Sequence, residues 1–325
     1  MSWRKRSEEE AAMAALRRES PSLHWKKILA RILQVKGGRA VRKDKRVGIK
    51  TMQKRGFVLY YSFSLLRQLG YRIENPFRIS SKHMLILARY WMKNKLAPVT
   101  ISNYFSILGI FGDWLGKHTL VDAARAMLED SQMWRRTYAA DHDKSWSAYE
   151  IVTEQIIEKI GEFEPAAGIW VTLCDEFGLR LVEAMRLDPF RIEAVELVVY
   201  RDTKGGRQRR IPIWTESQRA VLACAQAFAR NNNGSLIRKD LTPDQARWRF
   251  QYALRKLGIT KKILGTTLHG LRAQFACDLL QSQGIVAPVR GGEKIDKNVY
   301  LDAIIRIMEL LGHSRVEIGA AYYGG

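Results

Sequence analysis

The sequence has few cysteines and no long apolar segment. Its three cysteines, Cys174, Cys224 and Cys277, lie far apart and are odd in number, which argues against a disulfide framework and against a Cys-x-x-Cys metal or redox site. No run approaches the ~18 uninterrupted apolar residues that a membrane span needs. Residues 1–10 mix both charge signs and no apolar segment follows them, so they do not form a secretory signal. We therefore expect a globular protein of the reducing cytoplasm.

Acidic residues are scarce relative to basic ones. The 325 residues include 54 Lys and Arg but only 33 Asp and Glu, which gives a formal net charge of +21. Solubility of a small domain needs a net charge of only about 2 to 8. The excess therefore favours a polyanionic partner, either nucleic acid or an anionic membrane surface.

The basic residues are densest between positions 36 and 55, where Asp44 is the single acid. This density favours an arm that binds DNA phosphates. The predicted DNA contacts of the arm are Arg39, Arg42, Lys43, Lys45, Arg46 and Lys50. A solvated basic linker without a partner is the alternative. A membrane-bound amphipathic helix fits less well, because Gly37, Gly38 and Gly48 interrupt any long apolar face.

Helix signals fall into two groups, separated by a polar stretch over residues 135–147. In the first group, residues 51–69 and 100–114 place apolar side chains at helical spacing, which is typical of a packed core. No cluster of candidate catalytic side chains accompanies them. The first part of the chain therefore predicts a basic N-terminal arm (1–47) and a helical DNA-binding module (48–135).

The second group, over residues 145–325, combines helices with a short sheet. Apolar residues at 195–199, a Thr-Lys-Gly-Gly turn at 203–206 and an extended segment at 211–213 predict a β-hairpin with a basic tip. Helices are predicted over 149–163, 169–187, 267–283 and 296–311, and after the capping residues Thr215 and Thr242. We therefore expect a mainly α fold with a small antiparallel β-sheet.

Several motifs in this second part contain residues suited to phosphodiester chemistry. Cutting and rejoining a phosphodiester without a metal needs a nucleophile, positive donors around the nonbridging oxygens and an acid for the leaving oxygen. The candidates are Arg180 followed by Glu183, Lys204 at the hairpin tip, His269-x-x-Arg272, and His313 nine residues before Tyr322. The hairpin also carries Arg207 and Arg209, which we predict to contact DNA. Each fragment alone is common, and an Arg–Glu pair at this spacing is usually a surface ion pair.

The order of these motifs resembles that of the tyrosine site-specific recombinases, the phage integrase family, from residue 145 to the end. The resemblance implies that Tyr322 attacks the scissile phosphate to form a 3′-phosphotyrosyl link and release a 5′-hydroxyl. It implies that Arg180 and Arg272 clamp the nonbridging oxygens and that Lys204 protonates the leaving oxygen. His269 would act in proton transfer, and His313 would donate a hydrogen bond to the phosphate. Glu183 would support the site.

The resemblance also implies the wider architecture and function. The catalytic domain would be tyrosine-recombinase/type IB topoisomerase-like, and the preceding module would be a core-DNA-binding (SAM-like) domain. No metal, nucleotide or redox cofactor is implied. The expected activity is site-specific strand exchange of the integrase or excisionase type for a mobile genetic element, in a cytoplasmic, nucleoid-associated protein. Partners would be double-stranded DNA with paired half-sites, further protomers in a homotetramer, and accessory DNA-bending or directionality proteins, with no membrane.

Three departures and two alternatives qualify this interpretation. Tyr323 adjoins Tyr322, but only Tyr322 has the family spacing from His313. The stretch over 285–302 is an insertion, and it is either an added DNA contact or a surface excursion. The sequence ends at Gly325, so we expect protomers to assemble without the tail that many family members dock on a neighbour. The alternatives are a catalytically silent DNA-binding protein and a topoisomerase-like enzyme that relaxes DNA.

Overall fold

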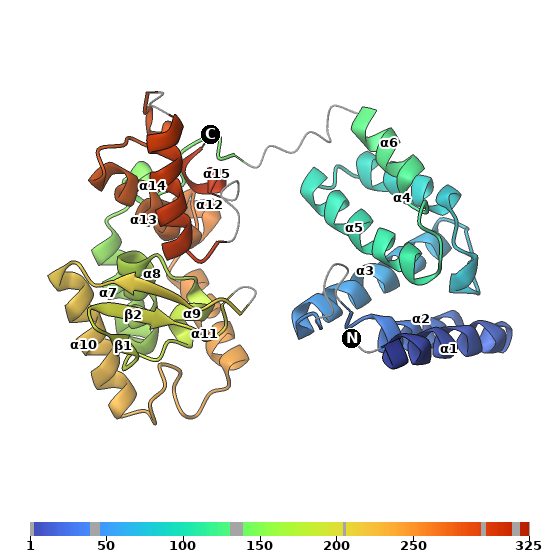
Figure 1. Cartoon of the computed structure of the whole chain (residues 1–325), viewed down its shortest axis with the longest axis horizontal. Coiled ribbons are helices and arrows are strands. Elements are labelled where there is room, and N and C mark those ends of the chain that lie inside the picture. The colour runs from blue at the N-terminus through green and yellow to red at the C-terminus, as the bar shows by residue number, and fades with distance from the viewer. Residues whose placement is uncertain are drawn as a thin grey trace. The chain divides into compact units, whose positions relative to one another are not determined.

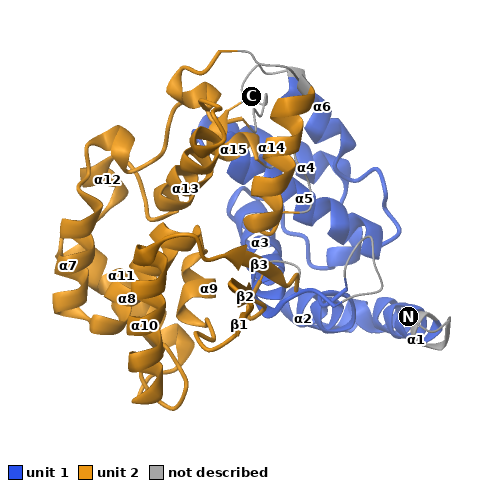
Figure 2. Ribbon diagram, turned by 60° about the vertical axis from the view of Figure 1, so that its left-hand side comes forward, with its two compact units in different colours: residues 1–136 blue, residues 137–325 orange. Residues whose placement is uncertain are grey.

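The computed structural model describes residues 3–39, 46–130, 139–203, 206–293, 297–313 and 319–324. The chain divides into two compact units, residues 1–136 and 137–325, which are coloured separately in Figure 2. Within the described residues, no helix combines the length and the apolar character that crossing a membrane requires.

The described residues of unit 1 form helices and their connections, with one isolated bridge between Arg39 and Arg46 (Figure 1). Its α-helices are α1 (Trp3–Glu19), α2 (Trp25–Lys36), α3 (Ile49–Gln68), α4 (Ser81–Lys93), α5 (Pro98–Trp114) and α6 (Asp122–Asp130). Short 3₁₀ turns at Ser20–Ser22 and Pro76–Arg78 join some of them. Both helices predicted here, over 51–69 and 100–114, are confirmed as α3 and α5. The predicted core of α5 is also confirmed, since Phe105, Leu108 and Phe111 are fully buried.

The segment predicted as a basic arm is largely helical. Helices α1 and α2 contribute to the same apolar core as α3, α4 and α5. Trp25 of α2 stacks on Phe63 of α3 with ring centroids 6.1 Å apart. Residues 3–36 therefore differ from an extended arm, because their apolar faces are buried with the rest of the unit.

The predicted DNA contacts of this segment have different surroundings. Arg39 forms an isolated antiparallel bridge with Arg46, and its guanidinium pairs with Glu9 at 3.0 Å. Arg46 and Lys50 are exposed. The remaining three, Arg42, Lys43 and Lys45, lie outside the described residues.

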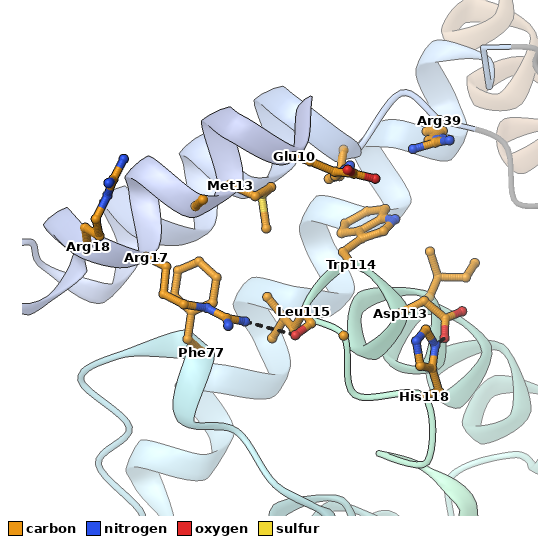
Figure 3. A pocket seen from close by; sticks show the side chains of 14 residues that line it. Glu10, Met13, Arg17, Arg18, Arg39, Phe77, Asp113, Trp114, Leu115 and His118 are labelled. Carbon is orange, nitrogen blue, oxygen red and sulfur yellow. Dashed lines mark hydrogen bonds and ion pairs between the residues drawn. The ribbon is translucent and has the colours of Figure 1, made fainter. Parts of the chain in front are cut away.

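A cavity of about 860 Å³ lies between α1 and the end of α5 (Figure 3). Met13 and Trp114 are among the side chains that line it. The Arg17 guanidinium lies over the Phe77 ring, 5.0 Å from its centroid, and donates a hydrogen bond to the Leu115 carbonyl at 3.0 Å. Arg17 therefore ties α1 to two connecting segments of the unit.

Unit 2 is mainly helical and contains one small sheet (Figure 1). Its α-helices are α7 (Thr153–Phe163), α8 (Pro165–Phe177), α9 (Leu181–Met185), α10 (Glu216–Arg230), α11 (Pro243–Lys256), α12 (Lys261–Leu264), α13 (His269–Ser282), α14 (Lys297–Leu310) and α15 (Ala320–Tyr323). Turns of 3₁₀ helix occur at Ser147–Tyr149 and Pro288–Arg290. Thr215 and Thr242 cap α10 and α11 through hydrogen bonds with Gln218 and Gln245, which confirms both predicted caps.

The sheet has three antiparallel strands in the order β1 (Ile192–Glu193), β2 (Glu196–Val199) and β3 (Arg209–Pro212). The predicted hairpin is confirmed as β2 and β3, in which Val199 pairs with Arg209 and Leu197 with Ile211. The short strand β1 was not predicted. Because side chains alternate between faces along a strand, Arg209 and Ile211 point to the same face, and both are buried.

The predicted helix over 169–187 is wrong, because the chain breaks between α8 and α9. Gly178 adopts φ +57, a conformation that favours glycine. A Cβ at this position would lie 2.5 Å from the Phe275 ring, so the contact with α13 also excludes a side chain. Arg180 consequently lies on extended backbone at the N-cap of α9 instead of in the middle of a helix.

Helix α13 lies between the two apolar clusters of unit 2. Its Leu271 packs with α8, α10 and the sheet, whereas Phe275 and Ala276 pack with α14 and α15. Because α13 is packed on both sides, the position of its first turn is fixed. The motif His269-x-x-Arg272 occupies the first turn of this helix.

The insertion over 285–302 is partly helical and anchored to the unit. It contains the 3₁₀ turn at Pro288–Arg290 and the beginning of α14. The Arg290 guanidinium pairs with Asp143 at 3.0 Å and with Asp278 at 2.6 Å. These ion pairs connect the insertion to α13 and to the segment before α7.

Candidate active site

Five of the six predicted catalytic residues are described, and their side chains converge in unit 2. They come from separate elements: Arg180 from the N-cap of α9, His269 and Arg272 from α13, His313 from the segment after α14, and Tyr322 from α15. The sixth, Lys204, lies outside the described residues in the connection between β2 and β3.

Arg272 is the most enclosed member of the cluster, with 1% of its surface exposed. Its guanidinium donates to the carbonyl oxygens of Gly178 and Leu311, and its Nε donates to the Tyr322 hydroxyl at 3.2 Å. Burial lowers the pKa of Arg272 to about 10, although the nearby Tyr322 opposes this shift. The side chain is therefore charged at neutral pH and fixed in orientation by backbone acceptors.

His313 connects the two arginines to the tyrosine. Its Nε2 lies 3.0 Å from the Tyr322 hydroxyl, 3.3 Å from Arg272 Nη2 and 3.4 Å from Arg180 Nη2. The imidazole within hydrogen-bonding distance of the tyrosine hydroxyl is thus that of His313. Two guanidinium groups, one imidazole and one phenol therefore face a common point.

His269 also lies beside the ring of Tyr322. Its ring centroid is 5.5 Å from that of Tyr322, and the residue keeps substantial exposure to solvent. Desolvation by neighbouring atoms, followed by the positive charges of Arg272, Arg180 and Lys144, lowers the pKa of His269 to about 4. The imidazole is therefore uncharged at neutral pH and able to accept a proton.

Glu183 forms an ion pair with Arg180 and is 1% exposed. Its carboxylate accepts hydrogen bonds from Arg180 Nη1 at 2.6 Å and from the Arg180 backbone N–H at 2.9 Å. Burial alone would raise its pKa, but hydrogen bonds and charge from Arg209 and Arg180 hold the pKa at about 2. Glu183 is thus a buried carboxylate that stays ionised and orients Arg180.

Arg209 differs from the role predicted for it. Its side chain is 4% exposed, and it pairs with the Glu183 carboxylate at 2.7 Å, so it does not point outward to DNA. The alternation of side chains along β3 could have indicated this, because Arg209 shares a face with the apolar Ile211. Arg207, two residues earlier, is exposed, and its contact with DNA stays a prediction.

Tyr322 and Tyr323 are both buried but face different surroundings. The Tyr322 hydroxyl lies at His313 and Arg272. The Tyr323 ring packs edge-on against Tyr300, with centroids 6.1 Å apart, and its hydroxyl lies against Gly319, where a Cβ would be 2.1 Å away. Of the two, Tyr322 is therefore the one that lies among the candidate phosphate ligands.

The arrangement can bind an anion at the two guanidinium groups and present a phenol oxygen to it. Planar guanidinium forks suit the nonbridging oxygens of a phosphate. A pentacoordinate phosphorus would gain further from fixed donors, because they need no rearrangement as charge develops. The geometry is consistent with nucleophilic attack by Tyr322 on a phosphodiester.

Comparisons with known proteins identify the fold. Residues 139–278 match the family model described as Integrase. The chain is similar in structure to a lambda integrase dimer bound to a COC' core site, at 14% sequence identity with a TM-score of 0.57, covering 93% of this chain and 77% of that one. It is similar to the XerH site-specific recombinase bound to palindromic difH substrate, at 16% identity and TM-score 0.53, covering 91% of this chain and 80% of that one.

A third similar structure is the Tn1549 transposon integrase in complex with a circular intermediate DNA. The identity is 14%, the TM-score is 0.53, and the likeness covers 93% of this chain and 96% of that one. No curated protein matches the sequence. At these identities, the likeness to solved structures shows a shared fold.

Proposed function

We propose that this protein cuts and rejoins DNA at specific sites through a 3′-phosphotyrosyl intermediate, because residues 139–278 match the family model described as Integrase and the motifs of unit 2 resemble those of the tyrosine site-specific recombinases. The natural reaction would be strand exchange for a mobile genetic element, of the integrase or excisionase type. Arg180, Lys204, His269, Arg272, His313 and Tyr322 would form the catalytic set.

One observation carries the assignment of the nucleophile. The Tyr322 hydroxyl is within hydrogen-bonding distance of both Arg272 Nε, at 3.2 Å, and His313 Nε2, at 3.0 Å. Donors that contact the hydroxyl stabilise its oxyanion, and the same donors can contact the phosphate that it attacks. This geometry supports Tyr322 over Tyr323, whose ring packs against Tyr300.

In the proposed step, the Tyr322 oxygen attacks the scissile phosphorus. A bond forms between that oxygen and phosphorus, and the bond to the 5′-oxygen breaks, so the number of phosphoester bonds is conserved. Arg180 and Arg272 hold the nonbridging oxygens while the charge on them increases. The free 5′-hydroxyl of another strand then reverses the step and completes the exchange.

Two residues carry the proposed proton transfers, and a third donates to the phosphate. Lys204, by resemblance to the family, gives a proton to the departing 5′-oxygen. His269, by resemblance to the family, accepts the tyrosine proton; its ring lies 5.5 Å from that of Tyr322 and is uncharged at neutral pH. The negative charge of a bound phosphate would oppose the cations that depress its pKa, and so make His269 a stronger base in the complex. His313 donates to the phosphate.

The proposed partner is duplex DNA with paired half-sites. The related lambda integrase was solved as a dimer on a core site. By analogy, two protomers of this protein would occupy one site and four would join two sites. Accessory DNA-bending or directionality proteins would set the outcome, and the protein would act in the cytoplasm at the nucleoid.

The test is formation of a covalent protein–DNA adduct. Nicked duplex fragments that tile the DNA on both sides of the gene are incubated with the protein in EDTA, and SDS-resistant adducts are counted. Tyr322→Phe is expected to abolish the adduct, whereas Tyr323→Phe, its matched neighbour, should retain it. Loss of the adduct with Tyr323→Phe alone would make Tyr323 the nucleophile and contradict the assignment of Tyr322.

Two other outcomes would favour the alternatives. Tight, sequence-specific binding without any adduct would favour a catalytically silent DNA-binding protein. Efficient relaxation of supercoiled plasmids that lack any particular sequence would favour a topoisomerase-like enzyme. Adducts confined to one fragment, with exchange between two copies of it, are the result that recombination predicts.

A further inference from the structure

We propose that Arg209 is a positioning residue of the cleavage site: it holds the Glu183 carboxylate, and through it Arg180, in place, and it connects the β2–β3 hairpin to both. This inference rests on the proposed function. It assigns to Arg209 a role different from DNA contact, and it makes β3 part of the support of the site.

The Glu183 carboxylate is shared evenly by two arginines. Its Oε1 accepts from Arg180 Nη1 at 2.6 Å and from Arg209 Nη1 at 3.1 Å. Its Oε2 accepts from the Arg180 backbone N–H at 2.9 Å and from Arg209 Nη2 at 2.7 Å. Arg209 thus contacts both oxygens, which fixes the plane of the carboxylate and with it the direction of Arg180.

Arg209 also lies against the segment that carries His313. A Cβ at Gly312 would lie 3.1 Å from Arg209 Cδ and 3.2 Å from its Nη1. Gly312 has φ +67, so a glycine suits this position both for its conformation and for the close approach of the arginine. Arg209 therefore packs directly beside the residue that precedes His313.

The position of Arg209 along the chain links a third element. It is the first residue of β3 and pairs with Val199 of β2. The connection that contains Lys204 begins and ends at this pair, and Lys204 precedes Arg209 by five residues. A contact that holds Arg209 in place therefore also fixes the base of that connection.

The charges explain why a second arginine is needed. A single carboxylate paired with Arg180 alone would offset the charge that Arg180 offers to a phosphate. With Arg209 present, two guanidinium groups share one carboxylate, so the pair of arginines keeps an excess of positive charge. Removing one partner from a buried ion-pair network is costly. Without Arg209, Glu183 would keep only its contacts with Arg180, and nothing from β3 would fix the plane of the carboxylate.

Arg210 provides a matched control on the same strand. Its side chain is 49% exposed and pairs at the surface with Glu193 at 2.6 Å. Replacing Arg210 removes one positive charge from β3 without touching Glu183. An effect confined to Arg209 therefore cannot come from the loss of strand charge alone.

The experiment compares the wild-type full chain with Arg209→Gln, Arg209→Lys and Arg210→Gln. Two quantities are measured on the fragment that gives wild-type adduct: the single-turnover rate of adduct formation at saturating protein, and the dissociation constant over a range of salt. We expect Arg209→Gln to slow adduct formation by about a hundredfold, the effect of a misplacement of about 1 Å, with its dissociation constant within about threefold of wild type.

The lysine variant distinguishes positioning from folding. An ammonium supplies the charge but not the two-point contact, so Arg209→Lys should recover part of the rate and bind DNA like wild type. Arg210→Gln should cleave at the wild-type rate. Thermal unfolding of each variant is recorded, and if Arg209→Gln does not fold, the rate of Arg209→Lys against that of Arg210→Gln decides the question.

Several results would overturn the proposal. Cleavage at the wild-type rate by both Arg209 variants would show that the residue is dispensable. A weaker affinity with a flatter salt dependence and an unchanged rate would make Arg209 a phosphate contact. Equal losses of rate and affinity that follow the loss of thermal stability would make it merely structural. Absence of adduct with the wild-type protein would instead refute the proposed function.

Discussion

At the scale of single residues, the ionisation of Glu183 depends directly on the fold. It is fully enclosed, and its charge is held by Arg209 and Arg180. Its pKa is about 2 in the folded protein, against an ordinary value of 4.5. An unfolded chain therefore binds a proton at Glu183 at a pH where the folded chain does not.

This difference predicts a loss of stability in acid. The stabilisation from Glu183 is fully present above about pH 4.5 and is lost as the pH falls toward about 2; it amounts to about 3 kcal/mol. Urea unfolding of wild type and Glu183→Gln at a series of pH values measures it. The difference in unfolding free energy should shrink as the pH falls.

Glu216→Gln is the control, since Glu216 is 88% exposed. Its difference from wild type should change little with pH. A difference between wild type and Glu183→Gln that stays constant from neutral pH into acid would contradict the role of Glu183 as a buried, ionised carboxylate.

At this scale, residue types and order were enough to predict the cluster around Tyr322. The family spacing from His313 favoured Tyr322 over Tyr323, and the contacts with Arg272 and His313 agree with that choice. The second partner of Glu183, Arg209, was not predicted. The neighbouring basic residues Arg207 and Arg210 favoured an exposed side chain, although alternation along β3 places Arg209 on the same face as the buried Ile211.

At the scale of elements, the break between α8 and α9 positions Arg180. Gly178 has φ +57 and lies against the Phe275 ring of α13. The Gly178 carbonyl accepts a hydrogen bond from Arg272. The same turn therefore sets the direction of Arg180 and supplies an acceptor to Arg272.

Gly178→Ala should consequently damage both stability and cleavage. A Cβ would lie 2.5 Å from the Phe275 ring, and strain combined with overpacking costs about 2 to 4 kcal/mol. Gly284→Ala is the matched control, because Gly284 has φ +77 but no neighbour within 4 Å of the added Cβ. It should cost only about 1 kcal/mol.

Denaturant unfolding and the rate of adduct formation check this prediction. Equal destabilisation by the two alanine variants would show that the contact with Phe275 is not important. The break itself could not be read from the sequence, since residues 169–187 are apolar enough to continue as one helix. Caps with a local signature, such as Thr215 with Gln218, were predictable because both partners lie within one turn.

At the scale of the whole molecule, the net charge of +21 predicts DNA binding that weakens steeply with salt. Each phosphate neutralised contributes about −0.9 to the slope of log K against log salt concentration. Arg46 and Lys50 of unit 1 are exposed, and as DNA contacts they stay predictions.

Arg46→Gln and Lys50→Gln should each reduce the salt slope by about 1. The measurement is fluorescence anisotropy with labelled duplex over a range of salt concentrations. Arg31→Gln is the control, because Arg31 is 51% exposed but pairs with Glu19 at 2.6 Å. Slopes unchanged in all three variants would place the DNA-binding surface elsewhere.

Composition and helix signals predicted two groups of elements, and the chain divides at residues 136 and 137. They did not predict that residues 3–36 share the core of unit 1. High charge density concealed the apolar faces of α1 and α2, because Arg17 and Arg18 follow the buried Leu16 directly, and Lys26 and Lys27 precede the buried Ile28. Long-range packing of this kind has no local signature.

We propose Tyr322 as the nucleophile, held by Arg272 and His313. The most direct measurement is tandem mass spectrometry of the adduct formed in EDTA, after digestion of both the DNA and the protein. A nucleotide 3′-phosphate attached to Tyr322 is the predicted result. Attachment to Tyr323, or to any other side chain, would contradict the assignment of Tyr322 as the nucleophile.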